Sequence, residues 1–133
     1  MALEQSLRDK IISSVEAGFD AQISYTQDLI RLQSVRGEEY VIQDRVFDEF
    51  RNRGYAMERF EMDEAAITRH PGGSPFSEDH SRAPIVVGTH RPRHTTGRSL
   101  ILQAHVDVVP PGPHSLWTHP PFDPVIEGDW LYG

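Results

Sequence analysis

Two side chains that could do chemistry together, His105 and Asp107, lie near the end of an apolar stretch. The stretch runs from Leu100 to Pro110 and is rich in β-favouring residues, so it predicts a buried strand that ends near this pair. Residues i and i+2 of a strand share one face, and open α/β sheets bind ligands beyond the carboxyl ends of their strands. The pair could therefore line a ligand site. Taken alone, the triplet is better explained as two ordinary polar residues at a strand exit, and the surrounding sequence has to decide.

The composition limits both the site and its partners. With 133 residues, 38% hydrophobic and 25% charged, the chain has the make-up of a soluble globular protein. It contains no cysteine, so any metal would be held by His nitrogen and carboxylate oxygen. A formal charge of -7 without a block of Lys and Arg argues against nucleic acid and membrane as partners. No apolar run approaches the roughly 20 residues that cross a bilayer, and the amino terminus lacks a signal-peptide pattern, so we expect a cytoplasmic location.

Helices are expected before the predicted strand. Apolar residues recur about every four positions from Leu3 to Leu32, which predicts a helical region with a break near Gly18. We interpret this apolar stripe as a core-facing surface rather than a partner-binding one. Glu38 and Glu39 place negative charge in the first turn of a second helix, where the helix dipole favours it.

The rest of the chain predicts strands and loops. Strands are expected near residues 55–61, 84–89, 98–104 and 125–132. The strand at 98–104 should be the most buried, because it is apolar on both faces as interior strands are. Residues 63–84 contain few apolar side chains, which predicts a long loop or insertion. His70 and His80 lie in this segment, and we expect them to be solvated rather than ligands.

A Pro-rich loop at residues 110–124 follows the His-x-Asp pair. Trp117 and Phe122 lie in this loop and need burial, so we interpret them as side chains that pin the loop to the core. The alternative is that they face a substrate. Beyond the loop, Gly128 and Asp129 lie between apolar residues, which is typical of a turn between two strands.

Several further residues extend the His-x-Asp pattern in a fixed order and spacing. They are residues 102–110 around the pair, then Trp117, Pro121, Phe122, Pro124, Ile126, Gly128 and Leu131-Tyr132-Gly133. In this order they resemble the first metal-site motif of the M20 metallopeptidases, which include acetylornithine deacetylase, succinyl-diaminopimelate desuccinylase, aminoacylase and related carboxypeptidases. Residues 29–39 are similar to the family's opening helix and turn, so the resemblance spans about residues 28–133. The first 27 residues and the 63–84 segment are closest to the deacetylase-like branch.

The resemblance implies an α/β fold, the amino-terminal part of a zinc-exopeptidase-like catalytic domain with helices packed on a mixed sheet. It also implies two divalent metals, usually zinc and sometimes cobalt, that hydrolyse an amide bond of an N-acylated amino acid or peptide-like substrate. His105 falls on a ligand of the first metal, and Asp107 on the catalytic carboxylate that orients this imidazole. A neutral imidazole suits zinc, and a neighbouring carboxylate fixes its tautomer. The family commonly has glycine before the ligand, and Ala104 is still small.

Other catalytic positions of the family fall beyond Gly133. They comprise the aspartate that bridges both metals, a glutamate pair with the general base, two later ligands and an inserted dimerisation domain. We therefore expect residues 1–133 to be a single incomplete catalytic domain, with residues 1–27 as a helical extension. Such a chain should be inactive alone, because a catalytic zinc needs about three protein ligands. The resemblance allows a homodimer for the full-length protein, and the alternative is a non-catalytic remnant or an interaction module.

Overall fold

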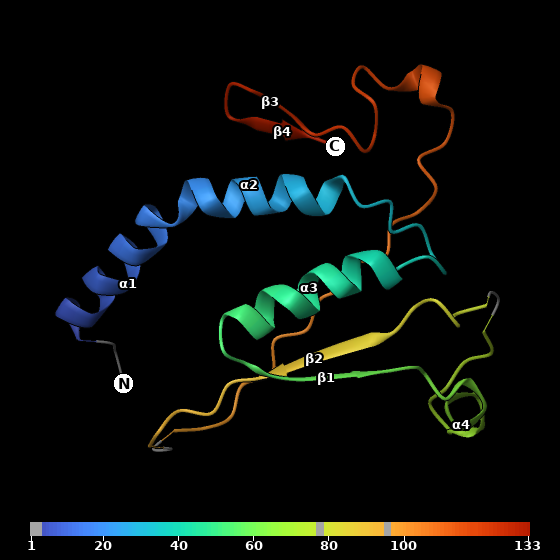
Figure 1. Cartoon of the computed structure of the whole chain (residues 1–133), viewed down its shortest axis with the longest axis horizontal. Coiled ribbons are helices and arrows are strands. Elements are labelled where there is room, and N and C mark those ends of the chain that lie inside the picture. The colour runs from blue at the N-terminus through green and yellow to red at the C-terminus, as the bar shows by residue number, and fades with distance from the viewer. Residues whose placement is uncertain (1–3, 77–78, 95–96) are drawn as a thin grey trace. The chain divides into compact units, whose positions relative to one another are not determined.

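The computed structural model describes residues 4–76, 79–94 and 97–133 of the chain (Figure 1). Its helices are α1 (Gln5–Ala17), α2 (Phe19–Ile30), α3 (Tyr40–Asn52) and α4 (Glu64–Arg69), with a 3-10 turn at His114–Leu116. Its strands are β1 (Ala56–Phe60), β2 (Ile85–Thr89), β3 (Val125–Glu127) and β4 (Trp130–Tyr132). The strands form two antiparallel sheets, β1-β2 and β3-β4. The chain is therefore an α/β protein, which confirms the predicted class.

The chain divides into two compact units, residues 32–116 and residues 1–31 with 117–133. The prediction of a single domain stays a prediction. In the first unit β1 pairs with β2 in a register that places Ala56 opposite Thr89, and α3 packs on this sheet. The Phe50 ring of α3 stacks on Tyr55, with 5.4 Å between the ring centroids. Gly54 adopts a φ of +82°, which lets the chain turn from α3 into β1.

The second unit joins two helices to a hairpin. α1 ends and α2 begins at Gly18, which confirms the predicted break. β3 and β4 are connected through Gly128, whose φ of +60° fits the predicted turn. The side chain of Gln27 in α2 donates a hydrogen bond to the Pro124 carbonyl oxygen at 3.4 Å. Contacts of this kind hold the hairpin against the carboxyl-terminal half of α2.

The Pro-rich loop is anchored by Phe122 and its neighbouring prolines, and not by Trp117. Pro121 and Pro124 are buried and Phe122 is half-buried, whereas Trp117 keeps 41% of its surface exposed. The interpretation of a pinned loop therefore holds for Phe122 and is wrong for Trp117. The rigid proline rings next to Phe122 provide the buried surface instead.

The interpretation of the amino-terminal apolar stripe as core-facing is wrong for α1. Leu7, Ile11 and Val15 keep 46, 47 and 58% of their surface exposed, although they form one face of the helix. Leu3, the first residue of the stripe, lies outside the described residues. Within its own unit α1 runs end to end into α2 at Gly18, so α2 does not cover the apolar face of α1 (Figure 1). An apolar helix face is buried only where another element covers it.

The predicted central strand at residues 98–104 is also wrong. Leu100, Ile101 and Leu102 are 80, 88 and 87% exposed, and residues 97–104 form no strand. A β-favouring sequence becomes a strand only when a neighbouring backbone supplies the ladder of hydrogen bonds. Across the three described ranges, no strand pairs with this segment. The predicted strands at 55–61, 84–89 and 125–132 do find such neighbours, and they are confirmed.

The segment at 63–84 contains a helix that the sequence analysis did not predict. Asp63 caps α4, since its side chain accepts a hydrogen bond from the Ala66 amide at 2.8 Å. A helix of six residues is too short to show an apolar period, so only the cap could have revealed it. Residues 77 and 78 of the segment lie outside the described residues, and its origin as an insertion stays a prediction. No helix in the described ranges has the length and apolar character that a membrane span requires.

Candidate functional site

The structure brings the two predicted site residues together. His105 Nδ1 lies 3.1 Å from the Asp107 carboxylate oxygen Oδ1 and 3.1 Å from the Asp107 backbone oxygen. Both oxygens can only accept a hydrogen bond, so this contact requires a proton on Nδ1, and in the neutral form of the ring Nε2 then keeps a free lone pair. The His105 side chain is 84% exposed and that of Asp107 30% exposed. A carboxylate orients a histidine metal ligand in this way.

The backbone on both sides of Asp107 is held by a distant segment of the same unit. The Ser34 hydroxyl donates to the Val106 carbonyl oxygen at 2.6 Å, and the Val108 amide donates to the Ser34 carbonyl oxygen at 2.9 Å. Val35 and Val108 form an isolated parallel bridge. Ser34 is only 3% exposed, so water does not compete for its hydrogen bond. Sequence reasoning missed this residue, because a serine after a helix gives no sign of its distant partner.

Arg36 provides a second partner for the Asp107 carboxylate. Its guanidinium Nε lies 3.6 Å from Asp107 Oδ2, while Oδ1 of the same carboxylate contacts His105. The Arg36 side chain is about half exposed. Asp107 therefore lies between a cation and an imidazole, and each of its oxygens faces one of them.

The pair fits one metal ligand with its orienting carboxylate, but it does not make a complete metal site. In the part of the chain that the structure describes, no group of three or more His, Cys, Asp or Glu side chains could hold a metal ion. Zinc sites need about three protein ligands or more. Within the described ranges, His105 and Asp107 alone supply too few ligands for such a site.

The other histidines that the sequence raised as ligands have local partners. His70 Nδ1 accepts a hydrogen bond from the Gly72 amide at 3.1 Å, and His70 is exposed as expected. His80 is 14% exposed, so the expectation of a solvated side chain is wrong for it. Its Nδ1 lies 3.5 Å from Glu64 Oε1, and its ring meets the edge of a neighbouring phenylalanine ring. In the other unit, His119 Nε2 lies 3.1 Å from Glu127 Oε1.

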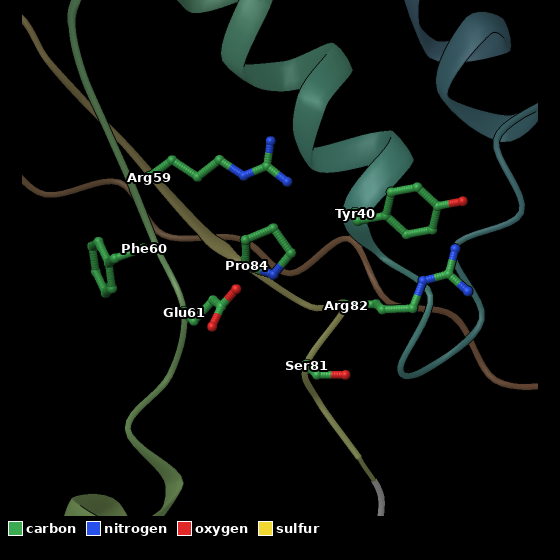
Figure 2. A pocket seen from close by; sticks show the side chains of 7 residues that line it. All are labelled: Tyr40, Arg59, Phe60, Glu61, Ser81, Arg82 and Pro84. Atoms are coloured by element: carbon green, nitrogen blue, oxygen red, sulfur yellow. The ribbon is translucent and has the colours of Figure 1, made fainter.

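A hollow of about 440 Å³ lies in the first unit, but it does not include the His-Asp pair. Figure 2 shows the residues that line it, Tyr40, Arg59, Phe60, Glu61, Ser81, Arg82 and Pro84. The Arg82 guanidinium lies over the Tyr40 ring, 4.1 Å from its centroid, and pairs with Glu38 at 2.7 Å. Arg59 pairs with Asp44. Both arginines of the hollow thus pair with carboxylates of the same chain, and the Ser81 hydroxyl donates to Asp79 Oδ2 at 3.0 Å.

The structure thus combines an α/β fold with an exposed imidazole that contacts a neighbouring carboxylate. No family model matches it. Curated succinyl-diaminopimelate desuccinylases from Ralstonia nicotianae and Methylorubrum extorquens are 31% and 32% identical to it over 112 and 111 residues. These matches cover 84% of this chain and 26% and 25% of the relatives. A desuccinylase from Alkalilimnicola ehrlichii is 51% identical over 41 residues, 31% of this chain and 11% of the relative.

These likenesses confirm the resemblance that the motif around His105 indicates. The chain belongs to the M20 metallopeptidase family. It spans about a quarter of the length of the two relatives that cover most of it.

Proposed function

We propose that this chain belongs to a metal-dependent hydrolase that cleaves the amide bond of an N-acyl amino acid. The observation that carries the proposal is the His105 imidazole, whose side chain is 84% exposed and whose Nδ1 contacts Asp107. The relatives are named for removing a succinyl group from succinyl-diaminopimelate, which supports a succinylated amino acid as the substrate. We also propose that the complete protein acts in the cytoplasm on this small molecule and that it can form a homodimer.

The residues of this chain would have separate roles in that reaction. His105 would donate Nε2 to a divalent ion, zinc or cobalt, of which the complete site would hold two. When bound, such ions lower the pKa of a shared water and polarise the scissile carbonyl. Asp107 would keep the ring in the tautomer that leaves Nε2 free. The general base and the other ligands would come from residues outside the described part of the chain.

Hydrolysis by the complete gene product that carries these residues tests the proposal. The protein is freed of metal with a chelator, and release of the free amine from N-succinyl-diaminopimelate is measured before and after zinc or cobalt is restored. We expect activity that disappears on chelation and returns with metal, and weaker activity on an N-acetyl amino acid. Equal hydrolysis with and without metal would contradict the proposal, as would no hydrolysis of any N-acyl amino acid by the metal-loaded protein.

A non-catalytic remnant or interaction module is the second candidate. The observation that favours it is the exposed run from Leu100 to Leu102, together with the lack of a three-ligand group in the described ranges. Intact-mass measurement of the protein from its native source separates the two candidates. If the native protein has only 133 residues and binds no zinc, the second candidate is favoured.

A further inference from the structure

Arg36 contacts the proposed metal site without being able to bind the metal. Its Nε lies 3.6 Å from Asp107 Oδ2, on the opposite oxygen from the one that faces His105 Nδ1 at 3.1 Å. We propose that Arg36 is a positioning residue, which fixes the His105 imidazole by holding Asp107 in place. The inference rests on the proposed role of His105 as a metal ligand.

The imidazole needs such a restraint because little else in the described structure holds it. His105 is 84% exposed, and the strand expected to position it does not form. The ring therefore depends mainly on its hydrogen bond to Asp107. The final torsion of an aspartate side chain is broad and roughly two-fold, so a carboxylate with one partner can turn away. A cation on Oδ2 restricts this rotation and keeps Oδ1 on the imidazole.

The backbone around Arg36 gives its guanidinium a defined starting point. The Glu38 amide donates to the Val35 carbonyl oxygen at 2.8 Å, which closes a tight turn with Arg36 at its corner. Gly37 follows at a φ of +88°, a conformation that glycine adopts without strain. A Cβ on Gly37 would also lie 3.1 Å from the Asp79 carbonyl oxygen. The turn begins directly after Ser34, which forms hydrogen bonds with Val106 and Val108 on either side of Asp107.

The pair between Arg36 and Asp107 differs from the pair between Arg51 and Asp48 because its carboxylate also contacts the His105 ring. Arg51 pairs with Asp48 at 2.9 Å on the exposed face of α3. An exposed pair of this kind adds little to stability, so its loss should leave the fold intact. The Arg36 side chain is 49% exposed, against 61% for Arg51, so the Arg36→Gln variant should also fold. Its effect should appear at His105 instead.

The test is nitrogen NMR of the His105 ring in the metal-free complete protein, at a fixed pH at which the imidazole is neutral. The His105→Gln variant assigns the signals. In the wild type we expect the tautomer with the proton on Nδ1 to predominate. Arg36→Gln should shift the population toward the tautomer with the proton on Nε2, Arg36→Lys should restore part of it, and Arg51→Gln should leave it unchanged. Zinc affinity should fall about 10-fold or more in Arg36→Gln, the range typical for groups that support a ligand.

The outcomes separate this inference from the proposed function. Asp107→Asn provides the reference for a ring that has lost its carboxylate. If Asp107→Asn shifts the tautomer and Arg36→Gln does not, Arg36 has no positioning role, while the pair and the proposed hydrolysis are unaffected. If Arg36→Lys behaves like Arg36→Gln, or if Asp107→Asn itself causes no shift, the inference is overturned. The readout needs neither bound metal nor turnover, so failure of the proposed hydrolysis would not produce either result.

Discussion

The Asp107 carboxylate has two partners of different kinds, and this decides what each neighbouring residue can do. One oxygen accepts from His105 Nδ1, and the other faces the Arg36 guanidinium. A neutral imidazole with its proton on Nδ1 can offer only Nε2 to a metal. At the scale of single residues, the nitrogen that His105 presents therefore depends on its neighbour Asp107, and the role of His105 as a metal ligand stays a proposal.

Substitutions at His105 and Asp107 should have different effects in the complete protein. His105→Ala removes a ligand, so we expect it to lose both bound metal and hydrolysis. Asp107→Asn keeps the ligand but loses the charge that orients it, so turnover should fall about 10 to 100-fold with less loss of metal. Metal analysis beside kinetics measures both effects. Full metal occupancy and full turnover in His105→Ala would show that the site assignment is wrong.

At the scale of elements, α3 packs on both strands of the β1-β2 sheet and carries an ion-pair network on its surface. Glu49 lies between Arg45 and Arg53, at 3.2 and 2.7 Å. Both pairs have the i, i+4 spacing that stabilises helices. Hydrogen bonds from the Arg53 side chain, and then from Arg45, lower the pKa of Glu49 from its ordinary value of 4.5.

The lowered pKa predicts how the stability of α3 depends on pH. Glu49 is more acidic in the folded helix than in the unfolded chain, so its stabilising contribution is complete above pH 4.5 and is lost as the pH falls through the lower folded value. Glu49→Gln should therefore weaken α3 at pH 7 by about 0.5–1 kcal/mol, as expected for two such pairs, and should make no difference in strong acid.

Hydrogen exchange of the α3 amides at several pH values, corrected for the pH dependence of the intrinsic exchange rate, measures this dependence. Glu16→Gln serves as the control, because it removes the same charge from α1 in the other unit. An equal loss of α3 protection in Glu49→Gln at neutral pH and in strong acid would show that the ion pairs do not cause it.

At the scale of the whole molecule, the exposed run Leu100-Ile101-Leu102 has the strongest consequence. Leu100, Ile101 and Leu102 are consecutive apolar residues at 80–88% exposure, and no strand of the described ranges pairs with them, which favours pairing with another chain. We expect residues 1–133 expressed alone to associate, to bind zinc weakly and to hydrolyse no amide, because one imidazole cannot hold a catalytic metal.

A charge in this run should reduce the association of the 133-residue chain. Ile101→Lys should lower light scattering, because charged side chains oppose pairing of strand edges. Val87→Lys is the matched control, since it charges another exposed apolar residue, which lies in the already paired strand β2. A monomeric wild-type chain with metal-dependent hydrolysis would contradict the prediction, and it would mean that other side chains complete a site.

The sequence alone determined those features that depend on neighbours along the chain. The three longer helices, the break at Gly18, the turn at Gly128 and three of the four predicted strand regions all follow from local periods and glycine positions. The contact between His105 and Asp107 was also predictable, because the two residues are only two positions apart and their side chains can reach each other. The family motif depends on the same local order of residues.

Only the tertiary structure decided which distant segments meet. Ser34 and Val106 are 72 positions apart, and no local pattern links a serine after a helix to a carbonyl group beside the site. Arg36 reaches Asp107 because that same distant pairing brings the two segments together. The run from Leu100 to Leu102 failed as a strand for the converse reason, since β-propensity is a local property whereas a strand requires hydrogen-bond partners from another segment.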